Sequence, residues 1–358
     1  MAHASNTARL ATSALLVLLT FSYWASSTEP VPAPRPIYPR FDLTYLPEIG
    51  EQGLIGLRPA EMARYAKGAE LEVATQLFMM MLSQMYQTTD LDTSEFPNFA
   101  DIEQCVFSLS LQITTPKANE RGQFLFGVRT PCTIRTVDAF DWNHFMSKLF
   151  PKAIAKRLAG RTYLRQKLDT PATKDEVPYS GAMCFFIPDD RTLVVCDEEE
   201  MFELLDRLAA NKPAPNPPPG WSEVDRDFAA FVIDLREQKL VTGKFPPDYP
   251  WGKDLLKLLD SCQTIAFGFS LDERTALHAV GTTKNAAGSQ VAKRSLQRLM
   301  KAAKDKITVE AEEGLLKTMA LEILTGMSIE VSDIGLSLTA SAERNILELL
   351  IKLSGKAD

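Results

Sequence analysis

Large apolar residues alternate with small ones in two stretches of the chain, "VFSLSL" (106–111) and "IAFGFSL" (265–271). A period of two is typical of β-strands, whose side chains point to opposite faces in turn. An alternation of this kind suits antiparallel strands that have one face on a core. The pattern therefore predicts antiparallel sheet in both the first and the second half of the chain.

The expected elements follow the same order in each half: strand, helix, strand, strand, helix. The stretches that carry this order are "GLIGLRPAEMARYA" (53–66), "EQCVFSLSLQIT" (103–114), "GQFLFGVRT" (122–130) and "DAFDWNHFMSKLF" (138–150), then "FAAFVIDLREQKLV" (228–241), "SCQTIAFGFSLD" (261–272), "TALHAVGTT" (275–283) and "GSQVAKRSLQRLMKAAK" (288–304). We expect an α+β fold built from a duplicated module, each half a largely antiparallel sheet covered by helices on one face. The shared order of elements, rather than residue identity, supports the duplication.

Each half continues beyond this common order. The first half adds a strand (160–168), a hairpin (181–196) and a helix that opens with four acids, Asp197 to Glu200, where the helix dipole favours negative charge. The second half adds a helix (312–326), a strand (328–342) and a last helix (343–353).

The N-terminus has the order of a targeting segment. Residues 1–9 carry one cation and no acid, residues 10–25 form an uncharged apolar run, and "ASS" (25–27) offers small residues for cleavage. The run is short for a bilayer span, which needs about 20 apolar residues, although Tyr23 and Trp24 at its end suit a membrane interface. Residues 1–27 are thus either a signal peptide or an uncleaved signal-anchor. The remainder is expected outside the cytoplasm, periplasmic or secreted, and anchored by residues 10–25 if the segment is retained.

Two proline-rich stretches divide the rest of the chain. Residues 28–40 hold five prolines and predict an extended tether, the alternative being a disordered leader. "NKPAPNPPPG" (211–220) also has five prolines and excludes a helix or a central strand. We therefore place a first α+β domain at 41–210 and a second at 221–358. Membrane contact is expected only through the N-terminal segment.

Composition and motifs exclude several functions. A formal net charge of −7 and a pI of about 5.3 argue against a nucleic-acid partner. The chain has no HExxH, P-loop, GxSxG, GxGxxG, DxDxDG or CxxC motif. We accordingly expect no metal and no cofactor. Enzymatic activity is left open, with its absence the preferred interpretation.

Two pairs of residues are candidates for a role of their own. Arg58 and Arg236 each end an apolar strand just before a helix, and in a pseudo-twofold arrangement they would face a shared cleft and hold an anion; the alternative is two surface arginines. Cys184 and Cys196 lie in the strands of the 181–196 hairpin, opposite each other about Asp190. They are either a disulfide or two reduced, buried thiols.

The remaining candidates have an ordinary structural alternative. Asp141 is expected to cap the helix that carries His144, so this histidine is either a base or a surface residue. His278 alternates with apolar neighbours on a strand and has no visible catalytic partner. Met79 to Met81 and Met85 form either an adaptable binding surface or a core helix. The basic helix at 292–306 indicates either an acidic surface as partner or a solvated face.

The stretches "FDLTYLP" (41–47) and "GLIGLRPAEM" (53–62) are similar to a bacterial extracytoplasmic domain of unknown function, found in some proteins after BlaR-type membrane metallopeptidase modules. The resemblance extends through "DIEQCVFSLSL", "RTVDAFDWNHF" and "IPDDRTLVVC", but the peptidase module is absent. It implies a structural role for these motifs and no activity, with Phe41, Leu43, Tyr45 and Leu46 as core residues.

Three classes of function follow from these observations. The preferred one is a non-enzymatic exported domain that binds a ligand or protein partner at the cell envelope. The alternatives are a carboxylate-dependent hydrolase, drawing on Asp138, Asp141, Asp234 and Glu237, and a structural envelope protein.

Overall fold

The structure is a computed structural model of the chain. It describes residues 38–47, 53–65, 96–112, 125–167, 181–236, 252–270, 275–310, 321 and 324–342. Its strands are β1 (Gly53–Leu57), β2 (Ile102–Gln112), β3 (Leu125–Thr136), β4 (Ile154–Leu158), β5 (Arg161–Lys167), β6 (Ala182–Asp189), β7 (Thr192–Asp197), β8 (Ala229–Asp234), β9 (Cys262–Ser270), β10 (Thr275–Thr283), β11 (Ser328–Ser332) and β12 (Gly335–Ala342). Its helices are α2 (Pro59–Tyr65), the 3-10 turn η2 (Phe99–Asp101), α4 (Trp142–Leu149), α5 (Glu198–Ala209), α6 (Trp221–Val224), α7 (Gly252–Ser261) and α8 (Ala286–Glu310).

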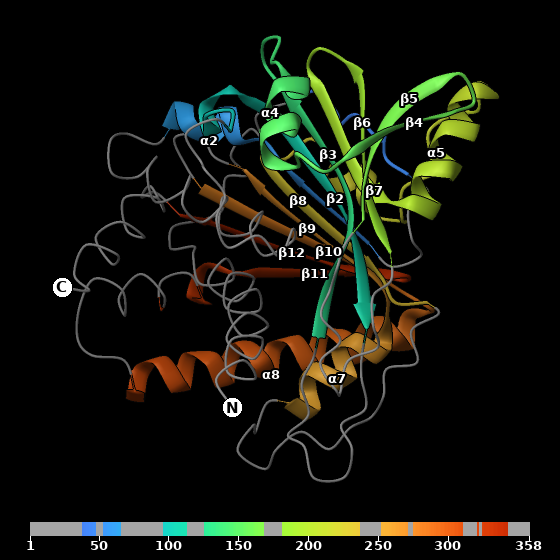
Figure 1. Cartoon of the computed structure of the whole chain (residues 1–358). Coiled ribbons are helices and arrows are strands. Elements are labelled where there is room, and N and C mark those ends of the chain that lie inside the picture. Colours follow the sequence, from blue (N-terminus) through green and yellow to red (C-terminus); the bar gives the residue numbers. More distant parts are fainter. Residues whose placement is uncertain are drawn as a thin grey trace, which may run out of the picture.

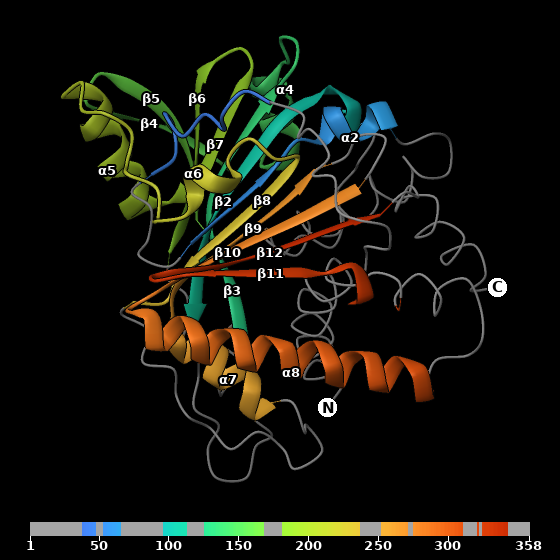
Figure 2. The same ribbon diagram turned by 180° about the vertical axis from the view of Figure 1, so that it is seen from behind.

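All twelve described strands belong to one sheet, in the order β11-β12-β10-β9-β8-β1-β2-β3-β7-β6-β5-β4. Every pair of neighbours in this order is antiparallel. Figure 1 and Figure 2 show the sheet from its two sides, with α7 and α8 at one end and α4 and α5 at the other. The expected α+β class with a largely antiparallel sheet is confirmed.

The two halves of the chain meet in the middle of this sheet. β1 pairs with β2 on one side and with β8 on the other, from Gly53 opposite Ile233 to Leu57 opposite Ala229. The proline-rich linker at 211–220 lies between α5 and α6, and strands from both sides of it are hydrogen-bonded to each other. The division into two domains stays a prediction, but the halves share a sheet.

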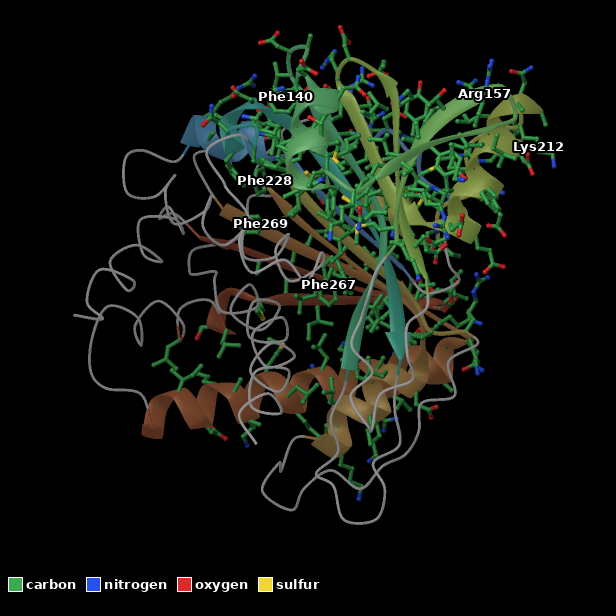
Figure 3. The ribbon with its side chains drawn as sticks, viewed as in Figure 1. Phe140, Arg157, Lys212, Phe228, Phe267 and Phe269 are labelled. Atoms are coloured by element: carbon green, nitrogen blue, oxygen red, sulfur yellow. The ribbon has the colours of Figure 1, made fainter. Side chains whose placement is uncertain are left out.

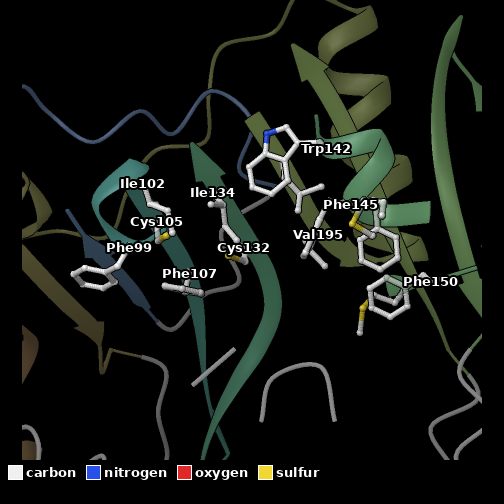
Figure 4. Close-up of a cluster of buried hydrophobic side chains, with 14 residues drawn as sticks. Phe99, Ile102, Cys105, Phe107, Cys132, Ile134, Trp142, Phe145, Phe150 and Val195 are labelled. Carbon is white, nitrogen blue, oxygen red and sulfur yellow. The ribbon is translucent and has the colours of Figure 1, made fainter. Parts of the chain in front are cut away.

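One face of the first half carries a core of aromatic and aliphatic residues (Figure 4). Alternate residues of β2, β3, β6 and β7 point into it, and α4 covers it with Trp142, Phe145 and Met146. Asp141 caps α4 as expected, because its carboxylate accepts a 2.9 Å hydrogen bond from the backbone N–H of His144. The apolar side of this helix faces the sheet: Trp142 and Phe145 are buried, and Leu149 packs against the cluster.

The opposite face of the same strands carries a second core under α5. Cys184, Phe186, Val194 and Cys196 point to this face and pack against Met201, Leu204 and Leu205 of the helix. Asp197 and Glu200 form a capping box at the start of α5, in agreement with the expected acidic first turn. The expectation that helices cover only one face is therefore wrong for the first half, because β6 and β7 are apolar on both faces.

The second half is covered by α7 and α8, which pack against each other and against one face of the sheet. Ile233, Leu235, Cys262 and Leu336 lie in the cluster beneath them. The single strand expected at 328–342 is instead the hairpin β11–β12, which turns at Asp333 and Ile334. The helices expected at 312–326 and 343–353 fall largely or wholly outside the described residues.

Candidate functional site beneath the N-terminal strap

Residues 38–47 lie across the sheet where the two halves meet, and we call this segment the strap. Phe41 packs directly on β1, because Gly56 has no side chain and a Cβ there would come within 2.8 Å of the ring. The Phe41 ring also contacts Trp221 of α6, with ring centroids 5.6 Å apart. The predicted core role of the strap is confirmed: Phe41 and Leu46 are buried, and Leu43 and Tyr45 pack against two of the buried clusters.

Arg58 fastens the first end of the strap. Its guanidinium donates to three backbone carbonyls: Pro39 in the strap, and Asp225 at 3.0 Å and Asp227 at 3.1 Å in the loop between α6 and β8. It also lies over the Phe41 ring, 3.8 Å from the centroid, where a cation is attracted to the π-face. Burial lowers the pKa of Arg58 to about 10, against smaller opposing effects of nearby acidic groups.

Two carboxylates are buried beside this arginine. Asp225 is 4% exposed and faces Arg40 of the strap, with Nε 3.5 Å from Oδ2. Its Oδ1 has no hydrogen-bond partner among the described residues. Burial raises the pKa of Asp225, although Arg40, Arg226 and Arg58 oppose the shift. Asp227 is equally buried, and its carboxylate lies over Gly268 of β9, where a Cβ would overlap Oδ2.

The other end of the strap is held by three further side chains. Gln104 of β2 makes two hydrogen bonds of 3.1 Å with the backbone of Asp42, accepting from its N–H and donating to its carbonyl. Arg207 of α5 donates to the carbonyls of Thr44 and Leu46, at 2.9 and 2.8 Å. Arg135 of β3 pairs with the Asp42 carboxylate at 3.3 Å.

The contacts of this cluster have a structural role, because they hold separate segments of the chain together. Peptide carbonyls accept the Nε and Nη2 donors of Arg58, so these are already used within the chain. A buried charged side chain hydrogen-bonded to backbone groups stabilises one arrangement of the segments that it joins. The site thus joins the strap, the strand β1 and the α6–β8 loop.

The two predicted anion-binding arginines are not brought together. Because β1 and β8 are antiparallel, Arg58 follows β1 at one end of the pair and Arg236 follows β8 at the other. Along the strand direction the two residues are eight positions apart, which is roughly 26 Å at about 3.3 Å per residue. Arg236 is an exposed surface arginine that forms an ion pair with Asp234, as the surface alternative expects, whereas Arg58 is buried.

One of the candidate carboxylates of a hydrolase lies apart from the others. Asp141 is occupied as the cap of α4, and Asp138 is exposed after the end of β3. Asp234 ends β8, three strands away from β3, and lies at the opposite end of the strands. Glu237 lies outside the described residues. Asp234 therefore does not form a catalytic pair, with about 5–10 Å between carboxyls, with Asp138 or Asp141.

The predicted register of the cysteine hairpin is confirmed, since Cys184 of β6 lies opposite Cys196 of β7. The turn is shorter than expected, with Asp189 opposite Thr192, and an irregularity between Phe186 and Asp189 restores the register. Both cysteines are buried free thiols. Burial raises the pKa of each thiol, to about 12 for Cys184.

Two histidines, His144 and His278, lie in the described part of the chain. His144 is exposed on α4. His278 of β10 lies opposite Gly268 of β9, so it shares a face with the residue beneath Asp227. The methionines at 79–81 and 85 are outside the described residues. Sequence patterns did not single out Asp225, Asp227 or Gln104, because their partners lie about 60 to 185 positions away.

The described part of the chain lacks two further features, a metal-binding cluster and a membrane-spanning helix. Among the described residues, no group of three or more His, Cys, Asp or Glu side chains is placed to hold a metal ion. Of the helices in this part of the chain, none is both long enough and apolar enough to cross a membrane.

Comparison with known proteins gives little. No family model and no curated protein matches the chain. Among solved structures it is similar to crystal form I of TP0453, at 11% sequence identity and a TM-score of 0.38, over 88% of this chain and 99% of that one. A likeness at this level carries no argument about function.

Proposed function

We propose that this protein is a non-enzymatic body that is exported, held at the cell envelope by its N-terminal segment, and binds a ligand or a protein partner there. One observation carries the proposal: the strap continues the proline-rich tether, whose last three residues it includes, and is fastened to the sheet at both ends. Arg58 holds its first part, and Gln104 and Arg207 hold the rest.

This fastening suits a body that is held by its N-terminus. A pull on the tether would reach the body first at Pro39 and Phe41, which are bonded to Arg58 and packed on β1. Buried hydrogen bonds to a charged group and apolar packing both resist such a pull. The contacts of the strap agree with both a cleaved signal peptide and a retained signal-anchor, since a tether precedes the strap in either case.

The order of the strands supports the duplicated module. Counting outward from the β1–β8 junction, the order is β1, β2, β3, β7, β6 on one side and β8, β9, β10, β12, β11 on the other. In each half the outer two strands form a hairpin that follows a helix, α4 or α8. The hairpin β4–β5 is then an insertion in the first half alone. We propose that the halves are related by a pseudo-twofold axis at the junction.

The resemblance to an extracytoplasmic bacterial domain agrees with this proposal and adds the compartment. The carboxylate-dependent hydrolase has less support, because Asp234 lies apart from Asp138 and Asp141, and Asp141 already caps α4. A structural envelope protein differs from the preferred function only in lacking a specific partner.

Fractionation and capture of the full chain test the proposal. In a bacterial host, the chain is expected in the membrane or periplasmic fraction and open to protease added outside the inner membrane. N-terminal sequencing then distinguishes a cleaved signal from an anchor. Cross-linking capture should recover the same partner from wild type and from Asp141→Asn, a carboxyl variant outside the strap. A cytoplasmic location, or substrate turnover abolished by Asp141→Asn, would refute it.

A further inference from the structure

The β4–β5 hairpin is strongly basic although the protein is acidic. Residues 151–167 contain no acid and six cations, whereas the whole chain has a net charge of −7. These cations are Lys152, Lys156, Arg157, Arg161, Arg165 and Lys167. The hairpin forms the edge of the sheet beside α5 (Figure 1).

Four of the six cations form no ion pair in the described part of the chain, although Lys156 lies close enough to Glu198 to help lower the pKa of that carboxyl. Arg165 is bound by both carboxylate oxygens of Glu198, at 2.5 and 2.9 Å. Lys152, Lys156, Arg157 and Arg161 are exposed, and no described acid lies within ion-pair distance of them. Other arginines of the sheet, such as Arg135 and Arg191, are paired with acids.

Protection of a sheet edge explains only part of this charge. Lysine and arginine on an edge strand prevent it from pairing with other chains, and Lys156 and Arg157 of β4 suit that role. Lys152, however, precedes β4, and Arg161 lies at the hairpin tip, before the part of β5 that pairs with β6 (Leu164–Lys167). Ile154 on β4 is 51% exposed, and an exposed apolar side chain does nothing to keep other chains away from the edge.

We infer that the β4–β5 hairpin binds the anionic headgroups of the membrane to which the N-terminal segment leads. The inference rests on the proposed function for the tether. Between the apolar run and Tyr38 lie residues 26–37, which in an extended polyproline conformation span at most about 37 Å. The strap (blue) and the hairpin lie at the same end of the molecule, the upper end in Figure 2. A short tether therefore keeps the hairpin near the bilayer.

The shape of the hairpin favours a lipid surface over an acidic protein. Lys156 lies opposite Tyr163 and on the face toward α5, whereas Arg157 lies opposite Thr162 and on the other face. Figure 3 shows Arg157 at the outer margin of the molecule, with Lys212 from the end of α5 in the same region. Mobile anionic headgroups can gather around cations on both faces of a projecting hairpin. An acidic protein would need acidic side chains in fixed positions on two sides of the hairpin. Each cation near an anionic surface strengthens binding by roughly fivefold.

A probe on the hairpin of the full chain tests the inference. Thr162→Cys provides an exposed thiol for a fluorophore, while the five native cysteines are buried. The labelled chain is mixed with phosphatidylcholine vesicles, with or without phosphatidylglycerol, that carry a quencher on the headgroups. We expect quenching on the anionic vesicles alone, weakening with salt. Lys156→Glu, Arg157→Glu and Arg161→Glu together should reduce the affinity at least tenfold.

Matched controls separate this inference from the tether. A probe at Thr308→Cys, exposed on α8, should not be quenched, and charge reversal at Arg294, Lys301 and Lys304 of α8 should leave hairpin quenching unchanged. Flotation with phosphatidylcholine vesicles alone measures membrane binding by the N-terminal segment. If the chain does not float with them, the tether is refuted. Flotation with anionic vesicles still tests the hairpin in that case. Equal quenching at both probe sites, or no effect of hairpin charge reversal in a variant with an unchanged circular dichroism spectrum, would overturn the inference.

Discussion

At the scale of single residues, the strap site shows how burial changes the role of a charged side chain. Arg58 and Arg236 have matching sequence contexts, yet one is 3% exposed and bonds to carbonyls while the other pairs with the carboxylate two residues before it. The difference arises because the strap and the α6–β8 loop cover the end of β1. Arg58 is therefore a fastening residue.

Asp225→Asn is expected to raise the free energy of unfolding at neutral pH. Burial raises the pKa of Asp225 in the folded protein above its unfolded value of about 3.9. Such a carboxyl contributes stability that is complete below the unfolded pKa and is lost as the pH rises through the folded pKa. At pH 7 the ionised group is therefore a net cost, which asparagine removes.

Urea unfolding at neutral pH and near pH 3 measures this effect. The advantage of Asp225→Asn should shrink at the lower pH, where aspartate is protonated as well. Asp138→Asn, at an exposed carboxyl, is the control and should differ little from wild type. A variant that is less stable at neutral pH would mean that the ion pair with Arg40 outweighs desolvation.

Sequence reasoning identified residues whose role is set by near neighbours. Asp141 as a cap follows from local pattern, and Phe41 and Leu46 as core residues follow from the resemblance to a known domain; the structure confirms both. It missed Gln104 and Asp225, because their roles depend on a segment that returns from far along the chain. No local signal distinguishes such residues from surface polar ones.

At the scale of elements, turns and insertions were the hardest to predict. β4 has the burial pattern of an exposed edge, so its sequence "IAKRL" shows no apolar alternation. α7 has an apolar stripe, but it follows a proline-rich stretch that obscures its start. The β6–β7 register was predictable because alternation fixes which residues share a face.

Ala159→Gly is expected to stabilise the β4–β5 hairpin. Ala159 and Gly160 have φ angles of 51° and 78°, the left-handed pair that two-residue hairpins adopt. A residue with a Cβ in the left-handed conformation destabilises the folded state by roughly 1–2 kcal/mol. Glycine removes this strain, but it also gives the unfolded chain more conformational entropy, which offsets part of the stabilisation. The net gain should be about 0.5–1 kcal/mol, measured by thermal or urea unfolding.

Ala155→Gly is the matched control, because Ala155 lies within β4 opposite Leu164. There the same substitution should lower stability by about 0.5–1 kcal/mol, since a strand interior does not need glycine. If both variants shift stability in the same direction, the turn strain is not the cause.

At the scale of the whole molecule, the halves share more than a sheet. The cluster beneath the strap combines Leu54 and Val106 from the first half with Trp221, Val232 and Ala266 from the second. The sequence indicated two similar halves but not their junction, because alternation shows which face a strand buries and not which strand it pairs with. β1 and β8 are separated by more than 170 residues.

This shared cluster predicts that the two halves unfold together. Trp142 lies in the first-half core and Trp221 at the junction, so Trp142→Phe and Trp221→Phe, each combined with Trp24→Phe and Trp251→Phe, leave a single tryptophan as fluorescence reporter in different places. Both variants should show a single urea transition, each with the same midpoint by fluorescence and by circular dichroism. Adding Leu54→Ala, at a fully buried residue of the shared cluster, should cost about 2–5 kcal/mol in each background. In two independent domains, Leu54→Ala would lower the midpoint of the first half alone, and a transition seen by fluorescence would separate from the one seen by circular dichroism. That outcome would show that the β1–β8 pairing does not couple the halves, and the strap could then not pass a pull from the tether to the whole sheet.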